Sequence, residues 1–176
     1  TRFSICFNAK KSKSLVFGPN RKHISKLTQD PVFQIGGNVV EIVTQWPHLG
    51  HIIDSRSADG PDILSRRNSL IGQVNNILCY FGKLNAATKL KLLQSYCSSF
   101  YGCELWDFSN DNIYDVCTVW RKALKRVWGL PLNTHSYLLS PLCDSIPIGD
   151  EFCRRGLLFI VSCLKSESPV VSYVVR

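Results

Sequence analysis

The spacing of apolar residues along the chain changes near residue 60. Before it, short runs of β-branched residues alternate with glycine turns, in Ser14–Gly18 and in Val32–Asp54. After it, apolar residues recur every three or four positions, which is the period of a helix that buries one face. The pattern therefore predicts an α+β chain, in which a small antiparallel β meander over residues 1–58 precedes an α-helical bundle over residues 59–176.

The meander is predicted from its turns. Gly36-Gly37 followed by Asn38 is typical of a hairpin turn, with one strand ending at Ile35 and a return strand over residues 39–43. A third strand is expected over residues 49–53. Residues 19–31 are polar and basic and lie between two prolines, so they are predicted to form a loop.

The helices are predicted from their apolar stripes and end signals. The first runs from Pro61 to about Phe81 with Gly82 as C-cap, and Asn85 caps the second. The third covers residues 112–128 and ends at Gly129-Leu130-Pro131, and shorter helices follow over residues 135–142 and 149–165. The residues expected to face inward on the third helix are Val116, Trp120, Leu124 and Val127.

Charge narrows the range of partners. Lys and Arg number 21 against 13 Asp and Glu, which gives a net charge of +8. This excess exceeds what solubility requires and favours a polyanionic partner, with nucleic acid first and an anionic membrane surface second. No apolar run reaches the roughly 18 residues of a membrane-spanning helix, and the first residues do not resemble a secretory signal.

The basic residues are clustered. Lys10, Lys11 and Lys13 precede the first strand, and Arg66 and Arg67 lie on the first helix. The third helix carries four cations whose spacing predicts a cationic face opposite Trp120 and Leu124. These four are Arg121, Lys122, Lys125 and Arg126. A merely solvated helix face is the alternative.

Cysteine and histidine give no metal site. The eight cysteines contain no Cys-x-x-Cys pair and fall mostly in helical apolar patterns, so free thiols in a reduced, intracellular protein are expected. His48 and His51, read as one strand, would point to opposite faces and would not converge on an ion. The chain also lacks methionine, and we expect it to be a piece of a longer protein cut at both ends.

Five segments, in order, resemble the C-terminal part of the reverse transcriptase of non-LTR (LINE-type) retrotransposons, which is an RNA-directed DNA polymerase. They are "FNAKKSKSLVF", "WPHLGHIID", "RRNSLIGQVNNILCYFGKL", "SSFYGCELWD" and "VWRKALKRVWGLP". The resemblance implies that the β part is the end of the palm and that the helices form the thumb. It implies RNA template and DNA primer as partners, in the nucleus and cytoplasm, together with fingers and palm that precede this chain.

The resemblance also implies roles for individual residues. Lys10, Lys11 and Lys13 would lie near the nucleotide phosphates. The segment "WPHLGHIID" would be the primer-grip hairpin, with His48, Leu49 and Gly50 at its turn. The cations of the first and third helices would bind the template-primer duplex.

The chain departs from the family because the Tyr-x-Asp-Asp turn is missing. Polymerase chemistry needs carboxylates that hold two divalent metals, Mg²⁺ in the complete polymerase. The acids present look structural, since Asp107 and Asp111 are expected to cap helices and Asp150-Glu151 to open one. We therefore expect no catalytic residue and no cofactor in this chain. Two alternatives remain open, a non-catalytic nucleic-acid-binding remnant and a helical protein-interaction domain.

Overall fold

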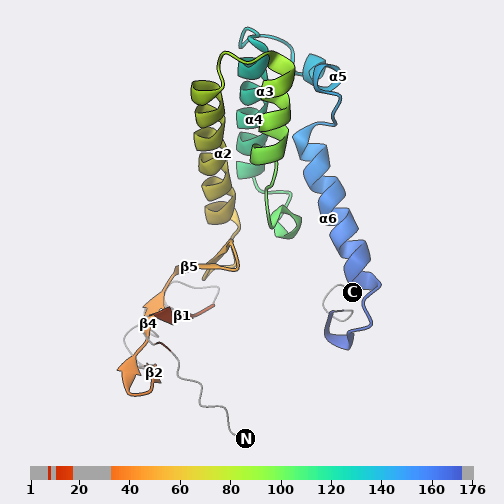
Figure 1. The fold of residues 1–176 in the computed structure, drawn as a ribbon. Coiled ribbons are helices and arrows are strands. Elements are labelled where there is room, and N and C mark those ends of the chain that lie inside the picture. Colours follow the sequence, from red (N-terminus) through yellow and green to blue (C-terminus); the bar gives the residue numbers. More distant parts are fainter. Residues whose placement is uncertain (1–7, 9–10, 18–32, 172–176) are drawn as a thin grey trace, which may run out of the picture. The chain divides into compact units, whose positions relative to one another are not determined.

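The computed structural model describes residues 8, 11–17 and 33–171 and has an α+β fold (Figure 1). It divides into two compact units, Thr1–Pro61 and Asp62–Arg176. The first contains the described strands and the second is helical. The predicted loop over residues 19–31 lies outside the described residues.

The described strands pair two by two. β2 (Gln34–Ile35) and β3 (Asn38–Val39) form an antiparallel hairpin, and β5 (Gln45–His48) and β6 (His51–Asp54) form another. β1 (Lys13–Leu15) pairs with β4 (Glu41–Val43), and this pair is parallel. The hairpin turn at Gly36-Gly37 is confirmed, since both residues have a positive φ.

The prediction of one continuous antiparallel meander is wrong. The expected return strand breaks at Val40, which is buried, and its second part turns to β1 instead of to the preceding hairpin. The apolar alternation marks which residues form strands, but it does not specify which strands pair. The third predicted strand is also displaced, because Leu49 lies in a turn and β6 begins at His51.

The long helices of the second unit follow the predicted stripes. α2 (Gly60–Tyr80) buries Ile63, Leu70, Val74 and Ile77 along one side. The predicted C-cap at Gly82 is wrong in detail, since Gly82 does not adopt the left-handed conformation. Its missing side chain instead makes room for the Leu78 carbonyl, which would lie 2.7 Å from a Cβ at this position.

α3 (Ala86–Cys97) begins as predicted at Asn85, whose side-chain oxygen accepts a hydrogen bond from the Thr88 amide at 2.8 Å. α4 (Asn112–Trp128) ends at Gly129, which has a φ of 65° and lets the Leu130 amide donate to the Lys125 carbonyl. The expected cap at Asp111 is wrong, because its side chain makes no cap hydrogen bond. Asn110 accepts from the Asn112 amide instead.

Two 3₁₀ turns and two further helices also belong to the second unit. A 3₁₀ turn, η2 (Cys103–Leu105), follows α3, and a second, η3 (Ser136–Leu138), leads into α5 (Leu139–Cys143). α6 (Ile148–Leu164) carries Asp150 and Glu151 in its first turn, as predicted. The other expected cap, Asp107, does not cap α4 but accepts hydrogen bonds from the amide and hydroxyl of Ser109.

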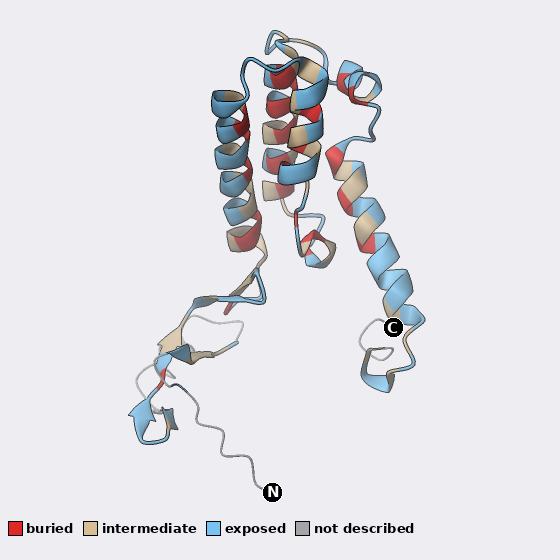
Figure 2. Cartoon of the chain, viewed as in Figure 1, coloured by how far each residue is buried: buried red, intermediate tan, exposed pale blue. Residues whose placement is uncertain are grey.

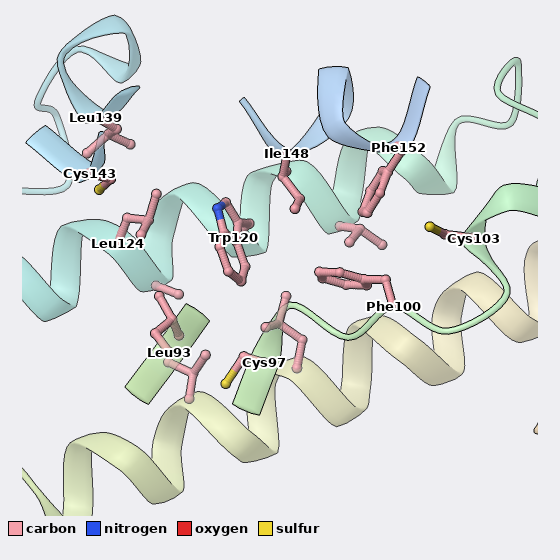
Figure 3. Close-up of a cluster of buried hydrophobic side chains, with 14 of the residues drawn as sticks. Leu93, Cys97, Phe100, Cys103, Trp120, Leu124, Leu139, Cys143, Ile148 and Phe152 are labelled. Atoms are coloured by element: carbon pink, nitrogen blue, oxygen red, sulfur yellow. The ribbon is translucent and has the colours of Figure 1, made fainter. Parts of the chain in front are cut away.

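The hydrophobic core lies in the helical unit. Buried residues line the inner sides of α2, α3 and α4 and the first half of α6 (Figure 2). Phe152 of α6 is fully buried, and its ring packs edge-on against Phe100 and Trp106 with centroids 5.0 and 5.4 Å apart. Figure 3 shows Phe100, from the segment after α3, near Trp120 of α4 and Phe152 of α6.

The second half of α6 is apolar and exposed, and Figure 2 shows it largely pale blue. The large apolar residues exposed there are Leu157, Leu158, Phe159, Ile160, Val161 and Leu164. A helix that is apolar on all sides is usually covered by protein. This half of α6 is therefore a candidate contact surface, distinct from the cations of α4.

Candidate nucleic-acid interface

The four cations of α4 do not share one solvent-exposed face. Lys125 is only 8% exposed, and its ammonium donates a hydrogen bond to the Leu132 carbonyl at 2.8 Å. The chain reverses at Gly129, so the loop that follows passes over the end of the helix and covers this lysine. The predicted cationic face is wrong at this position, because helical spacing does not show where the next segment lies.

Arg126 points to another helix. Its guanidinium donates to the Asn75 side chain of α2 at 2.8 Å. The arginine is exposed, but this contact carries it away from the other three cations. It serves below as a matched control for them.

Arg121, Lys122 and Lys125 line one small cavity, of about 280 Å³. We call this cavity the basic pocket, and its other polar side chains include Tyr114, Thr118 and Ser136. None of the described residues lining it carries a carboxylate. Within the described part of the chain, none of the three cations has an acidic partner within salt-bridge distance. The basic pocket therefore concentrates positive charge without internal neutralisation.

The cations of the basic pocket are held in place by neighbours. The Arg121 guanidinium donates to the Thr118 hydroxyl at 2.9 Å and lies 5.3 Å from the centroid of the Tyr114 ring. The Lys125 ammonium has three hydrogens, of which the Leu132 carbonyl takes one. Positioned N–H donors of this kind suit the several oxygens of a phosphate or carboxylate.

A second cavity adjoins the basic pocket. It measures about 370 Å³ and shares Tyr114, Arg121 and Ser136 with the basic pocket. We call it the aromatic pocket, since Tyr114, Trp120 and Tyr137 line it. Asp150, in the first turn of α6, is its carboxylate. The two cavities thus lie next to each other along α4 but differ in charge.

Arg66 and Arg67 do not line either cavity. Arg66 lies 3.9 Å from the carboxylate of Asp62, which is 1% exposed and accepts a hydrogen bond from the Trp106 indole at 2.9 Å. Arg67 donates to its neighbour Asn68 at 3.3 Å. Arg66 therefore balances a buried carboxylate at the start of α2, which is a structural role.

The lysines before the first strand lie in the other unit. Lys10 is outside the described residues, and Lys11 is exposed. Lys13 forms an ion pair with Glu41, its partner on β4, and its ammonium lies 5.6 Å from the centroid of the Trp46 ring. The charge of Lys13 is thus engaged within the unit, whereas that of Lys11 faces solvent.

The segment "WPHLGHIID" forms a hairpin whose turn is Leu49-Gly50. Both residues have a positive φ, of 49° and 80°, as the tight turns of two-residue hairpins require. Leu49 is 78% exposed at the tip. His48 and His51 are cross-strand partners flanking the turn. The expectation that they point to opposite faces is wrong, because they lie on two paired strands and such partners share a face.

No family model, curated protein or solved structure matches the chain. Among the described residues, no three His, Cys, Asp or Glu side chains are grouped so as to hold a metal ion. No described helix is long and apolar enough to cross a membrane. The geometry of the two cavities and the five sequence segments are therefore the features that point to a function.

Sequence reasoning missed the side chains that complete the two pockets. Thr118 and Ser136 carry no motif, and Ser136 comes from η3, beyond the end of α4. Tyr114 and Tyr137 gave no sequence signal either, because neither has a lysine or arginine close to it along the chain. They are 69% and 72% exposed.

Proposed function

We propose that this chain is the end of the palm and the thumb of a non-LTR retrotransposon reverse transcriptase, and that it binds the nucleic-acid backbone through the basic pocket. The observation that carries the binding proposal is the convergence of Arg121, Lys122 and Lys125 on one cavity without a carboxylate. The five ordered segments support the family. Catalytic carboxylates with Mg²⁺ would come from the preceding palm.

Within this proposal, the β5–β6 hairpin contacts the primer end. Its exposed tip, Leu49-Gly50, has no side chain at the glycine, which allows a nucleic-acid strand to approach closely. Lys11 and Lys10 would act near the nucleotide phosphates. Lys13 would have a lesser part, because its ammonium is paired with Glu41.

The test compares two substitutions that remove the same charge from the same helix. Lys122→Gln changes an exposed residue of the basic pocket, and Arg126→Gln changes an exposed residue outside it. Binding of the full chain to a DNA duplex is measured by fluorescence anisotropy over a range of salt concentrations. Each lost phosphate contact lowers the slope of log K against log salt by roughly 0.9. Lys122→Gln should therefore lower the slope, whereas Arg126→Gln should leave it nearly unchanged.

If the charges act only at long range, both substitutions should lower the salt slope equally, and this result would count against the basic pocket. A shallow slope for the unmodified chain would count against nucleic-acid binding altogether. Circular dichroism confirms that both variants stay folded, as expected for exposed substitutions.

A second candidate, a protein-interaction domain, is favoured by the second half of α6. Its exposed large apolar residues are consecutive from Leu157 to Val161, which suits contact with another protein. The two functions are compatible, since a thumb also packs against the rest of its polymerase. They separate in the salt titration, because apolar contacts release no counterions.

A further inference from the structure

The two adjoining pockets differ in the chemistry they can accept. The basic pocket presents three cations and the hydroxyls of Thr118 and Ser136. The aromatic pocket has a mainly apolar wall that includes the rings of Tyr114, Trp120 and Tyr137. Its volume, about 370 Å³, falls within the range of small-ligand sites. A ligand that filled both would need an anionic group connected by a short linker to a flat ring system.

The distribution of charge fixes the orientation of such a ligand. Asp150 lines the aromatic pocket and would repel an anion there, whereas the described wall of the basic pocket has no carboxylate. The anionic group therefore belongs in the basic pocket. Arg121 lines both cavities and its guanidinium stacks on Tyr114, so the boundary between them is itself cationic and aromatic.

A nucleotide has this composition, with a phosphate beside a planar base. In a duplex the bases are stacked and paired inside the helix, so only an unpaired nucleotide can place its base in a cavity next to its phosphate. Tyr137 is 72% exposed on the wall of the aromatic pocket and offers its ring to a base. Its ring is already oriented by stacking on His135, at 5.6 Å between centroids.

We propose that the helical unit captures one unpaired nucleotide, with its phosphate in the basic pocket and its base in the aromatic pocket. The proposal rests on the phosphate-binding role of the basic pocket given above and adds the class of substrate. The preferred ligand is then a single strand or a duplex with an unpaired end. A fully paired duplex would use the basic pocket alone.

Three DNA probes separate the contributions of phosphate and base. They are a blunt duplex, the same duplex with a short single-stranded overhang, and that overhang with abasic sites, which retains the phosphates and removes the bases. Because stacking of one base on an aromatic ring changes affinity by roughly tenfold or more, the full chain should bind the normal overhang about tenfold more tightly than the abasic one.

Protein variants then locate the effect. Tyr137→Ala should abolish the preference for the normal overhang and leave abasic binding unchanged, while Tyr137→Phe should keep the preference because the ring remains. Tyr80→Ala removes a tyrosine of α2 that is 79% exposed and lines neither pocket, so it serves as control and should have no effect.

The possible failures are distinguishable. Equal binding of normal and abasic overhangs, with a steep salt slope that Lys122→Gln lowers, would overturn the captured base and leave the phosphate role intact. A shallow salt slope for all three probes would overturn both proposals. A normal-overhang preference that survives Tyr137→Ala would place the base elsewhere and would also overturn the capture proposed here.

Discussion

At the scale of single residues, Leu49 combines a left-handed backbone conformation with an exposed apolar side chain. Its φ of 49° lies in the left-handed region, which costs a residue with a Cβ about 1–2 kcal/mol. Its side chain is 78% exposed, so little packing among the described residues offsets that cost. A strained residue at an exposed tip is consistent with the proposal that this hairpin contacts the primer end.

We predict that Leu49→Asn stabilises the β5–β6 hairpin by about 1 kcal/mol, because Asn-Gly is the preferred sequence of this turn. Amide hydrogen exchange of Trp46 and Ile53, which are cross-strand partners, measures the change. Leu49→Val should have the opposite effect, since a β-branched residue tolerates a positive φ poorly. If the asparagine variant opens more readily than the unmodified hairpin, the turn does not have the conformation described.

At the scale of elements, two glycines inside helices offer a matched comparison. A Cβ at Gly72 of α2 would meet nothing within 4 Å, whereas a Cβ at Gly156 of α6 would lie 2.7 Å from two ring carbons of Phe108. Gly72→Ala should therefore stabilise the protein by about 0.5–1 kcal/mol. Gly156→Ala should destabilise it by about 1 kcal/mol, because the clash exceeds the gain in helix propensity.

Urea unfolding followed by circular dichroism measures both changes. The second effect depends on Phe108, so Gly156→Ala should become neutral or stabilising in a Phe108→Ala background. A loss that persists in this background would mean that some contact other than Phe108 limits the space at Gly156.

The ion pair that attaches α6 to η2 predicts that the folding stability of the protein depends on pH. Arg155 donates to the Glu104 carboxylate from Nε at 2.8 Å and also from Nη2. Burial acts to raise the pKa of Glu104, but hydrogen bonds from its own amide and from Arg155 outweigh it, so the pKa is lowered from 4.5. A lowered pKa means that this contribution to folding is present above pH 4.5 and is lost as the pH falls through the folded-state pKa.

Glu104→Gln should therefore cost about 1–2 kcal/mol at neutral pH and little in acid. Thermal unfolding between pH 7 and pH 3 measures the difference between the two proteins. Arg155→Gln should cost a similar amount. The double variant should cost little more than either single variant, because each of the three proteins loses the same Arg155–Glu104 ion pair. Additive losses would show that the two side chains act independently.

At the scale of the whole molecule, the two units differ in how much core they contain. The buried hydrophobic cluster lies wholly in the helical unit, and Val40 is the one buried hydrophobic residue among the described residues of the first unit. Paired strands without a covering core are marginally stable in water. The first unit is therefore expected to depend on protein that packs against it.

We predict that a fragment of residues 57–176 keeps the helical circular dichroism of the chain and unfolds cooperatively, whereas residues 1–56 alone do not fold. Limited proteolysis of the full chain should cut first within residues 1–54. Earlier digestion of the helical part would contradict the division of the chain near residue 60. Cleavage sites are read by mass spectrometry at early times.

The sequence predicts the helices better than the strand pairing, for a physical reason. A helix makes its hydrogen bonds within one segment, so the apolar stripe and the Asn85 cap are enough to place α2, α3 and α4 closely. A strand needs a partner that the local pattern does not name, which is why the parallel β1–β4 pair was missed. The pairing of His48 with His51 was missed for the same reason.

The candidate site was predictable only in part. Helical spacing identified the four cations of α4, but the segment after Gly129 decides which of them meet. That segment buries Lys125 and supplies Ser136 to the basic pocket, while Arg126 turns to Asn75. A pocket formed by residues distant in sequence depends on tertiary packing, which no local pattern encodes.

Trp120 gives the protein an optical property that follows from its position. Its indole is 7% exposed, packs edge-on against Phe100 at 6.1 Å, and forms part of the aromatic pocket but not of the basic pocket. An indole responds in its fluorescence to a stacked or neighbouring base far more than to a distant phosphate. The chain therefore contains its own label for the arrival of a base, because Trp46, Trp106 and Trp128 do not line the aromatic pocket.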